Sequence, residues 1–210
     1  MTDNNCERSI SLLGNFERAS RSAELKIVPF STAERILSTP LSPCSACCPK
    51  VKEPHMTYCV AVKTRAGLVF LSDSRTNAGL DQISTFRKMI VYEEPGERFM
   101  CLLSAGNLSI SQSIREMLQV EQVRDAHTGE PITIWNAKSM FDATRVLGAA
   151  VRRVYERDAA ALRASGVEFN VSMIFGGQIG GEGMRLFQVY SPGNFIEATD
   201  ETPYFQIGES

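Results

Sequence analysis

The chain has 210 residues, of which 43% are hydrophobic and 22% are charged, so it is not disordered throughout. Its formal net charge is −2 and it has no run of basic residues, which gives little support to nucleic-acid binding. The longest uninterrupted apolar stretch, Val146–Val151, has six residues, against the roughly 20 that a membrane-spanning helix needs. The first residues show no basic segment followed by an apolar run, so we expect no secretory signal and a cytoplasmic protein.

Residues 1–56 differ in composition from the rest of the chain. Three prolines stand among small polar residues between Ser38 and Pro49, a pattern that excludes a helix or a central strand there. Before them, residues 23–37 have the spacing of a short amphipathic helix that is interrupted at Pro29. We therefore expect 1–56 to be a largely unstructured N-terminal extension, a propeptide or an over-extended gene start, and the folded domain to cover 57–210.

The six cysteines are unevenly placed along the sequence. Cys59 and Cys101 lie inside apolar, strand-like runs, where a cysteine behaves as a small buried hydrophobe. A structural zinc site needs four ligands, usually as two spaced pairs, and the cluster in the extension is not followed by a second pair. An unstructured linker is therefore favoured over a metal site for this cluster, which consists of Cys44, Cys47, Cys48 and His55.

From residue 57 onward the hydrophobic pattern is regular. Helical spacing predicts a helix after Gly106-Asn107 and a long helix from about Asn136 to Gly166. The glycines of 176–183 predict a hairpin connection, because no helix follows them as in a phosphate-binding loop. Strands are predicted over 57–63, 68–72, 88–92, 98–104, 168–175, 184–190 and 194–197. Strands, then helices, then strands indicate an α+β fold with helices layered on largely antiparallel sheets.

The sequence gives little support to a serine or cysteine nucleophile that is activated by histidine. The two histidines are His55, in the extension, and His127, in a polar loop. A hydroxyl can instead be activated by the free α-amino group of its own residue, whose pKa of about 7.7–8.0 leaves part of it neutral at cellular pH. That residue must be the first of the mature chain, and Thr57, which follows Met56 and opens the first regular strand, suits the role.

Two charged residues can complete such a site. A lysine near the threonine favours the neutral amine by like-charge repulsion and a developing alkoxide by attraction, and an aspartate holds the lysine in place. Asp73 ends the strand that is expected to form a hairpin with the strand beginning at Thr57, and Lys88 opens the next strand. The three residues are therefore expected to lie close together.

Four stretches of the sequence together resemble a known family. They are Thr57-Tyr-Cys-Val-Ala-Val62, Leu71-Ser-Asp-Ser-Arg-Thr-Asn-Ala-Gly79, Ser84-Thr-Phe-Arg-Lys88 and Leu103-Ser-Ala-Gly-Asn-Leu108. In combination they are similar to bacterial proteasome-type peptidases, most closely to the Anbu group of relatives of proteasome β-subunits, and the resemblance covers 57–210. It implies a four-layer αββα sandwich of the N-terminal nucleophile hydrolases, which here is incomplete at its C-terminal end because the family continues into further helices and strands.

The resemblance also implies an activity. It predicts a threonine-type endopeptidase that hydrolyses peptides or unfolded proteins without a cofactor or metal, as a homo-oligomeric ring or open helical ring. No nucleic-acid or membrane partner is expected. Two alternatives stay open: a hydrolase of small amides with the same machinery, and a catalytically silent, proteasome-like scaffold.

Roles for individual residues follow from the resemblance. Thr57 is expected to be the nucleophile, and Asp73 lies sixteen positions after it, which matches the spacing in the family. Lys88 lies thirty-one positions after Thr57, one short of the usual spacing. Gly106 matches the oxyanion-hole glycine, whose N–H contributes roughly 3–4 kcal/mol. The residues expected to align the substrate backbone are Thr76 and Asn77.

Each of these residues also has a purely structural interpretation. Thr57 could simply begin a strand, Asp73 could lie in a solvated turn, Lys88 could be a surface lysine, and Gly106 could only start a helix. In addition, the nitrogen of Thr57 is an amide while 1–56 are attached, and an amide cannot act as a base. Either translation begins at Met56 or a prosegment is cut there, and the absence of glycine before Thr57 favours the first possibility.

Overall fold

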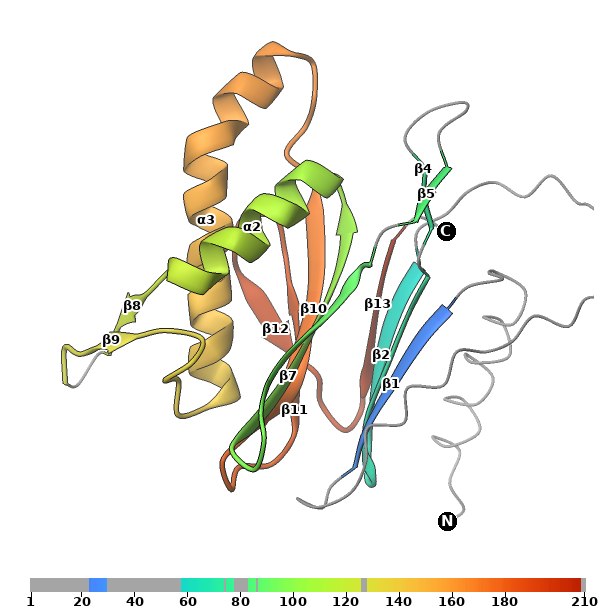
Figure 1. Cartoon of the computed structure of the whole chain (residues 1–210), viewed down its shortest axis with the longest axis vertical. Coiled ribbons are helices and arrows are strands. Elements are labelled where there is room, and N and C mark those ends of the chain that lie inside the picture. The colour runs from blue at the N-terminus through green and yellow to red at the C-terminus, as the bar shows by residue number, and fades with distance from the viewer. Residues whose placement is uncertain are drawn as a thin grey trace, which may run out of the picture.

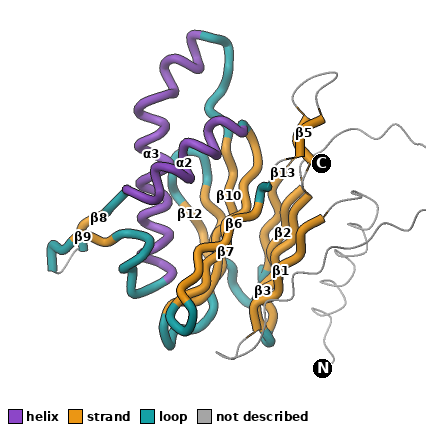
Figure 2. Tube along the Cα trace, in the orientation of Figure 1, coloured by secondary structure: helices purple, strands orange, loops and turns teal. Residues whose placement is uncertain are grey.

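The computed structural model describes residues 23–29, 58–73, 75–77, 83–85, 87–125 and 128–208, and for 23–29, 75–77 and 83–85 it describes the backbone only. Two helices and two main antiparallel sheets form successive layers in this part of the chain (Figures 1 and 2). No helix among the described residues is long and apolar enough to cross a membrane.

The first sheet, called sheet I here, has four antiparallel strands in the order β1-β3-β2-β13. β2 and β3 form a hairpin in which Cys59 pairs with Ser72 and Thr64 with Gly67. The strand bounds are β1 Ala23–Pro29, β2 Tyr58–Thr64, β3 Gly67–Asp73 and β13 Tyr204–Gly208.

The second sheet, called sheet II, has five antiparallel strands in the order β12-β11-β10-β7-β6. The bounds are β6 Met89–Glu94, β7 Arg98–Gly106, β10 Val171–Ile179, β11 Arg185–Val189 and β12 Phe195–Glu197. Figure 1 shows α2 (Leu108–Val120) and α3 (Met140–Ala164) on one side of sheet II and sheet I on the other. Two short pairs complete the described elements: β4 (Arg75–Asn77) with β5 (Ile83–Thr85), and β8 (Val123–Arg124) with β9 (Pro131–Ile132).

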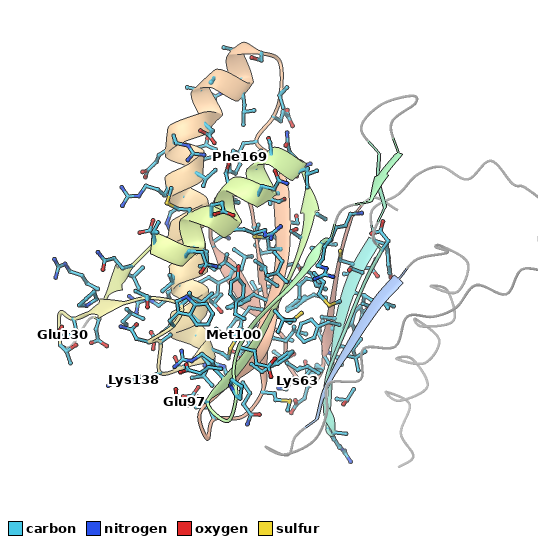
Figure 3. The ribbon with its side chains drawn as sticks, viewed as in Figure 1. Lys63, Glu97, Met100, Glu130, Lys138 and Phe169 are labelled. Atoms are coloured by element: carbon cyan, nitrogen blue, oxygen red, sulfur yellow. The ribbon has the colours of Figure 1, made fainter. Side chains whose placement is uncertain are left out.

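The central strand β7 of sheet II is buried on both faces, because its side chains alternate between two hydrophobic clusters. Met100 and Leu102 pack with the helices, whereas Cys101, Leu103 and Ala105 pack against sheet I. Figure 3 shows side chains filling the space between the layers. Each fully buried leucine contributes roughly 1.5–3 kcal/mol relative to an exposed one, so this central strand is held firmly.

The helices begin where side chains cap them. The Asn107 side chain accepts a hydrogen bond from the N–H of Ser109 at the start of α2. At the start of α3, the Ser139 hydroxyl oxygen accepts the N–H of Asp142 at 3.1 Å and donates to its carboxylate at 2.8 Å. This cap places the start of the long helix at Met140, four residues later than the sequence indicated.

The predicted α+β class is confirmed, and the described residues supply one helical layer and two sheets of the expected sandwich. The helix predicted over 23–37 is wrong for 23–29, which form strand β1 in pairing with Gly67–Asp73 of β3. Ile27 and Val28 are β-branched, and the edge of β3 offers backbone partners that an isolated helix lacks. The rest of 1–56, with its cysteine cluster, lies outside the described residues, so the domain boundary stays a prediction.

The glycine-rich segment is a hairpin connection, as predicted, but the strand before it is longer than expected. β10 continues through Gly176 and Gly177 to Ile179, and the turn follows at Gly180. Gly177 has to be glycine in this position, because a Cβ atom there would lie 2.0 Å from the carbonyl oxygen of Phe99. The absence of a side chain at Gly177 therefore allows β10 to approach β7 closely at this point.

Candidate active site

Four chain segments meet at one edge of the two sheets. β2 begins at Tyr58 and β3 ends at Asp73, so the antiparallel hairpin brings these two residues together. Lys88 directly precedes β6, and its carbonyl accepts the N–H of Ser104 at 3.2 Å, near the end of β7 at Gly106. Both hairpins therefore present their open ends on the same side of the layered core.

Asp73 and Lys88 form a buried, bidentate ion pair. The Nζ of Lys88 lies 2.9 Å from Oδ1 and 2.7 Å from Oδ2 of Asp73, and the two residues are 4% and 5% exposed. Two opposite charges removed from water in this way are stable only because they face each other. The alternatives of a solvated turn for Asp73 and a surface lysine for Lys88 are therefore wrong, whereas their catalytic roles stay predictions.

The same carboxylate also holds the beginning of β2. The backbone N–H of Tyr58 donates to Asp73 Oδ1 at 3.0 Å. This nitrogen is the peptide nitrogen that joins Tyr58 to Thr57, while Thr57 itself lies outside the described residues. Asp73 thus fixes the lysine ammonium and the first described peptide group of β2 at one point.

Gly106 stands where β7 turns into α2. Its φ of +103° belongs to a region that favours glycine, and a Cβ there would lie 2.5 Å from the carbonyl oxygen of Asn170. The next N–H, that of Asn107, donates to the same carbonyl at 2.9 Å, and Leu108 begins the helix. Gly106 therefore does precede a helix, as its structural interpretation held, and its oxyanion role stays a prediction.

Cys59 belongs to this site, although its sequence pattern indicated packing alone. Its side chain is fully buried between the sheets, and Sγ lies 3.8 Å from the carbonyl oxygen of Ser104. The pKa of the Cys59 thiol is raised to about 12, mainly by burial and also by the charge of Asp73, against an opposing effect of Lys88. The thiol is therefore protonated at neutral pH and is not a nucleophile.

The other predicted residues are only partly described. Thr76 and Asn77 lie in β4, where their backbones pair with Ser84 and Ile83 of β5. This extended backbone is the conformation that strand addition requires, but the two side chains are not described, so their contact with a substrate stays a prediction. His127 lies outside the described residues, and among those described no group of three or more His, Cys, Asp or Glu could hold a metal ion.

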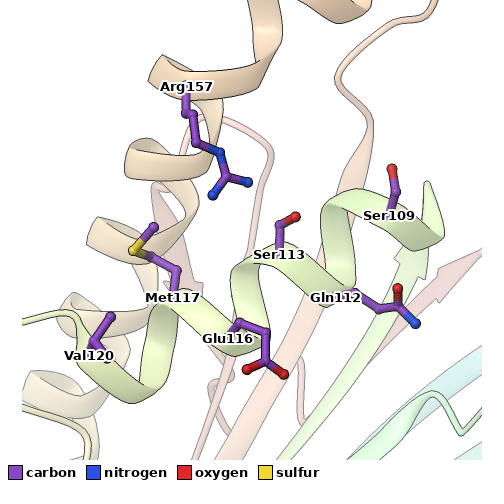
Figure 4. Close-up of a pocket in the computed structure, with 7 residues that line it drawn as sticks. All are labelled: Ser109, Gln112, Ser113, Glu116, Met117, Val120 and Arg157. Carbon is purple, nitrogen blue, oxygen red and sulfur yellow. The ribbon is translucent and has the colours of Figure 1, made fainter.

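A hollow of about 550 Å³ lies elsewhere, on the outer side of α2 (Figure 4). Arg157 of α3 points toward it from one side, and the half-buried Met117 and the exposed Val120 supply its apolar part. None of the residues at the open ends of the hairpins lines it. Its lining residues are Ser109, Gln112, Ser113, Glu116, Met117, Val120 and Arg157.

Comparison with known proteins identifies relatives among solved structures, whereas no protein-family model and no curated protein matches the chain. Anbu (ancestral beta-subunit) from Yersinia bercovieri is 51% identical, with a TM-score of 0.62. A Gly-1 mutant of Anbu from Hyphomicrobium sp. strain MC1 is 46% identical, with a TM-score of 0.63. Anbu from Pseudomonas aeruginosa, solved as a helical assembly of the Anbu complex, is 45% identical, with a TM-score of 0.63.

Each of these three matches covers 73% of this chain and 61% of the solved chain. The chain therefore spans somewhat less than two thirds of the length of these relatives. Identities of 45–51% over this length far exceed what a shared fold alone would need. The chain belongs to the Anbu family of proteasome-related proteins.

Proposed function

We propose that this protein is a threonine-type endopeptidase in which Thr57, once it is the first residue, is the nucleophile. The observation that carries the proposal is the buried Asp73–Lys88 ion pair, whose carboxylate also accepts the N–H of Tyr58 at 3.0 Å. Thr57 is covalently joined to that nitrogen, so its α-carbon is two bonds away from an atom in direct contact with Asp73. A lysine held so close to the start of a strand is the arrangement that this chemistry needs.

The reaction begins with a proton transfer within one residue. The neutral α-amine of Thr57 takes the hydroxyl proton, and Oγ1 attacks the carbonyl carbon of the substrate peptide. The negative charge then moves to the carbonyl oxygen, where the N–H of Gly106 is proposed to donate. When the tetrahedral intermediate collapses, the C–N bond breaks and the leaving amine takes the proton from the Thr57 ammonium. A water molecule activated by the same amine then hydrolyses the ester.

Lys88 and Asp73 act on this sequence through charge. The ammonium of Lys88 repels the protonated form of the nearby amine and stabilises the developing alkoxide of Thr57. Asp73 compensates the buried charge of Lys88 and keeps it from turning toward solvent. Both effects act within a largely water-free region, because both side chains are at least nine-tenths buried.

Substrate binding and assembly are proposed from the backbone of β4 and from the assembly of a relative. The extended backbone of β4 supports alignment of a peptide by strand addition, with Thr76 and Asn77 as the contacting residues. The helical assembly of the Pseudomonas aeruginosa relative supports a homo-oligomer for this chain as well. We therefore propose peptides or unfolded proteins as substrates of a self-assembled enzyme.

Covalent labelling tests the proposal. A full-length chain with a site-specific protease recognition sequence directly before Thr57 is folded, purified and cut in place. Incubation with a peptide epoxyketone, which bonds to both the hydroxyl and the amine of an N-terminal threonine, is expected to add one inhibitor mass to the peptide containing Thr57. The Thr57→Ala variant and the uncut chain are expected to stay unlabelled. A cut, folded protein that gives no adduct and cleaves no peptide would contradict the proposal, and cleavage of small amides alone would change the substrate class.

A further inference from the structure

We infer that Cys59 is a positioning residue, which links the strand that begins next to the nucleophile to the strand that carries the oxyanion-hole glycine. This inference rests on the proposed function and adds a residue to it. The inference starts from a closed chain of contacts at the open ends of the hairpins, called the circuit here, which consists of Cys59, Ser104, Lys88, Asp73 and Tyr58.

The circuit runs through both sheets. Cys59 donates its S–H to the carbonyl of Ser104 at 3.8 Å, and Ser104 donates its N–H to the carbonyl of Lys88 at 3.2 Å. Lys88 donates to both oxygens of Asp73, and Asp73 accepts the N–H of Tyr58, which is the chain neighbour of Cys59. Each proposed catalytic group thus lies on this circuit or within two residues of it in the chain.

The contact between Cys59 and Ser104 lies close in the chain to two proposed catalytic residues. Gly106 follows Ser104 by two residues on β7, and Thr57 precedes Cys59 by two residues before β2. The attacking oxygen and the N–H that receives the developing charge therefore come from different sheets, and their separation depends on how the sheets are spaced. Cys59 is fully buried in the cluster between the sheets, together with Ala61 and Ala105, and spans this gap by a direct contact.

The contact is weak in energy, because a thiol is a poor donor and 3.8 Å is long even for sulfur. We expect the contact to matter because it fixes the positions of the reacting groups, since a displacement of about 1 Å at a reacting centre lowers a rate by roughly 100-fold. Donation requires a protonated thiol, and burial together with Asp73 keeps it protonated by raising the pKa of Cys59 to about 12.

Cys101 provides a matched control for Cys59. It is also fully buried in the cluster between the sheets, and it lies on β7 three residues before Ser104, whereas Cys59 lies on β2 and contacts the Ser104 carbonyl itself. Replacing either cysteine with alanine removes one sulfur atom from the same hydrophobic cluster. A purely structural role for Cys59 therefore predicts equal effects of the two substitutions.

The test compares peptide hydrolysis by the chain cut before Thr57 in four forms: unmodified, Cys59→Ala, Cys59→Ser and Cys101→Ala. Cys59→Ala is expected to lower kcat by about 10–100-fold and to change KM by less than about threefold, because the substrate-aligning strand is untouched. Cys59→Ser, which keeps a donor, is expected to recover most of the loss, and Cys101→Ala is expected to keep kcat within about threefold. Equal losses in the two alanine variants, or no recovery with serine, would overturn the inference.

A second measurement on the uncut full-length protein separates this inference from the proposed function. Hydrogen exchange at residues 104–107 is expected to be about tenfold faster in Cys59→Ala than in Cys101→Ala, because the first substitution removes the contact of the Cys59 thiol with the Ser104 carbonyl. If the unmodified cut chain shows no peptide hydrolysis, the proposed function fails, and this exchange difference alone decides whether the link exists. Equal exchange in the two variants would overturn the inference whether or not the protein is active.

Discussion

Replacing Lys88 with methionine tests the buried ion pair directly. Methionine keeps the length and apolar stem of the lysine but removes the ammonium from the carboxylate of Asp73, which is 4% exposed and still accepts the N–H of Tyr58. Removing one partner of a buried pair typically costs about 3–5 kcal/mol, because the other charge stays buried without compensation. We expect the free energy of unfolding of the full-length protein to fall by about this amount.

Urea unfolding followed by far-ultraviolet circular dichroism measures this loss. The fluorescence of Trp135, the single tryptophan, gives a second probe of whether unfolding is two-state. Lys63→Met is the matched control, since Lys63 pairs with the fully exposed Asp200 at 3.7 Å, and it is expected to unfold at the same urea concentration as the unmodified protein. An additional Asp73→Asn substitution in Lys88→Met is expected to recover more than half of the loss, because no charge is then left buried. An unchanged midpoint in Lys88→Met would refute the reasoning.

Three further predictions concern other parts of the structure. Gly106→Ala is expected to lower stability and abolish peptide hydrolysis, because its Cβ would lie 2.5 Å from a carbonyl oxygen and its φ is +103°. Gly181→Ala, with open space around the position and no positive φ, should keep hydrolysis within about threefold in kinetic assays. The pKa of Cys59 rises from 9.0 to about 12 on folding, so the stability that the protonated thiol contributes is complete below pH 9 and is lost between pH 9 and 12. The free energy of unfolding of the unmodified protein should therefore fall relative to that of Cys59→Val above pH 9, by up to about 1.4 kcal/mol per pH unit in urea titrations. The same pH dependence in both proteins would contradict this. Ile27→Pro should lower the melting temperature by about 2–8 °C through loss of the pairing of β1 with Val69, and an unchanged melting temperature would show that β1 contributes nothing.

The sequence was sufficient to predict the elements with a strong hydrophobic period. The two helices, the five strands of sheet II and the strands β2 and β3 of sheet I follow from apolar spacing, whereas β13 was not predicted. The contact of Asp73 with Lys88 follows from the two hairpins that position them. The family resemblance drawn from four short stretches agrees with structural relatives that are 45–51% identical. Local patterns of this kind are informative because each is repeated over several turns or residue pairs.

Features that depend on tertiary contacts were not predictable. β1 is a strand because the edge of β3 is available to it, and nothing in the sequence of 23–29 indicates that partner. The circuit through Cys59 and Ser104 depends on the distance between two sheets, which no spacing along the chain specifies. The one available signal was the spacing of two residues between Thr57 and Cys59, because residues i and i+2 of a regular strand share a face.

The central claim is that the free nitrogen of Thr57 is the base. The most direct test keeps one extra residue, Met56, in front of Thr57. Two full-length chains are prepared, one cut before Thr57 and one cut before Met56, so that in the second chain Met56 is added and the nitrogen of Thr57 is an amide. General acid–base catalysis contributes about 10²–10⁴-fold, and we predict that retaining Met56 lowers the rate of peptide hydrolysis by at least about 100-fold. Equal rates for the two chains would contradict the account.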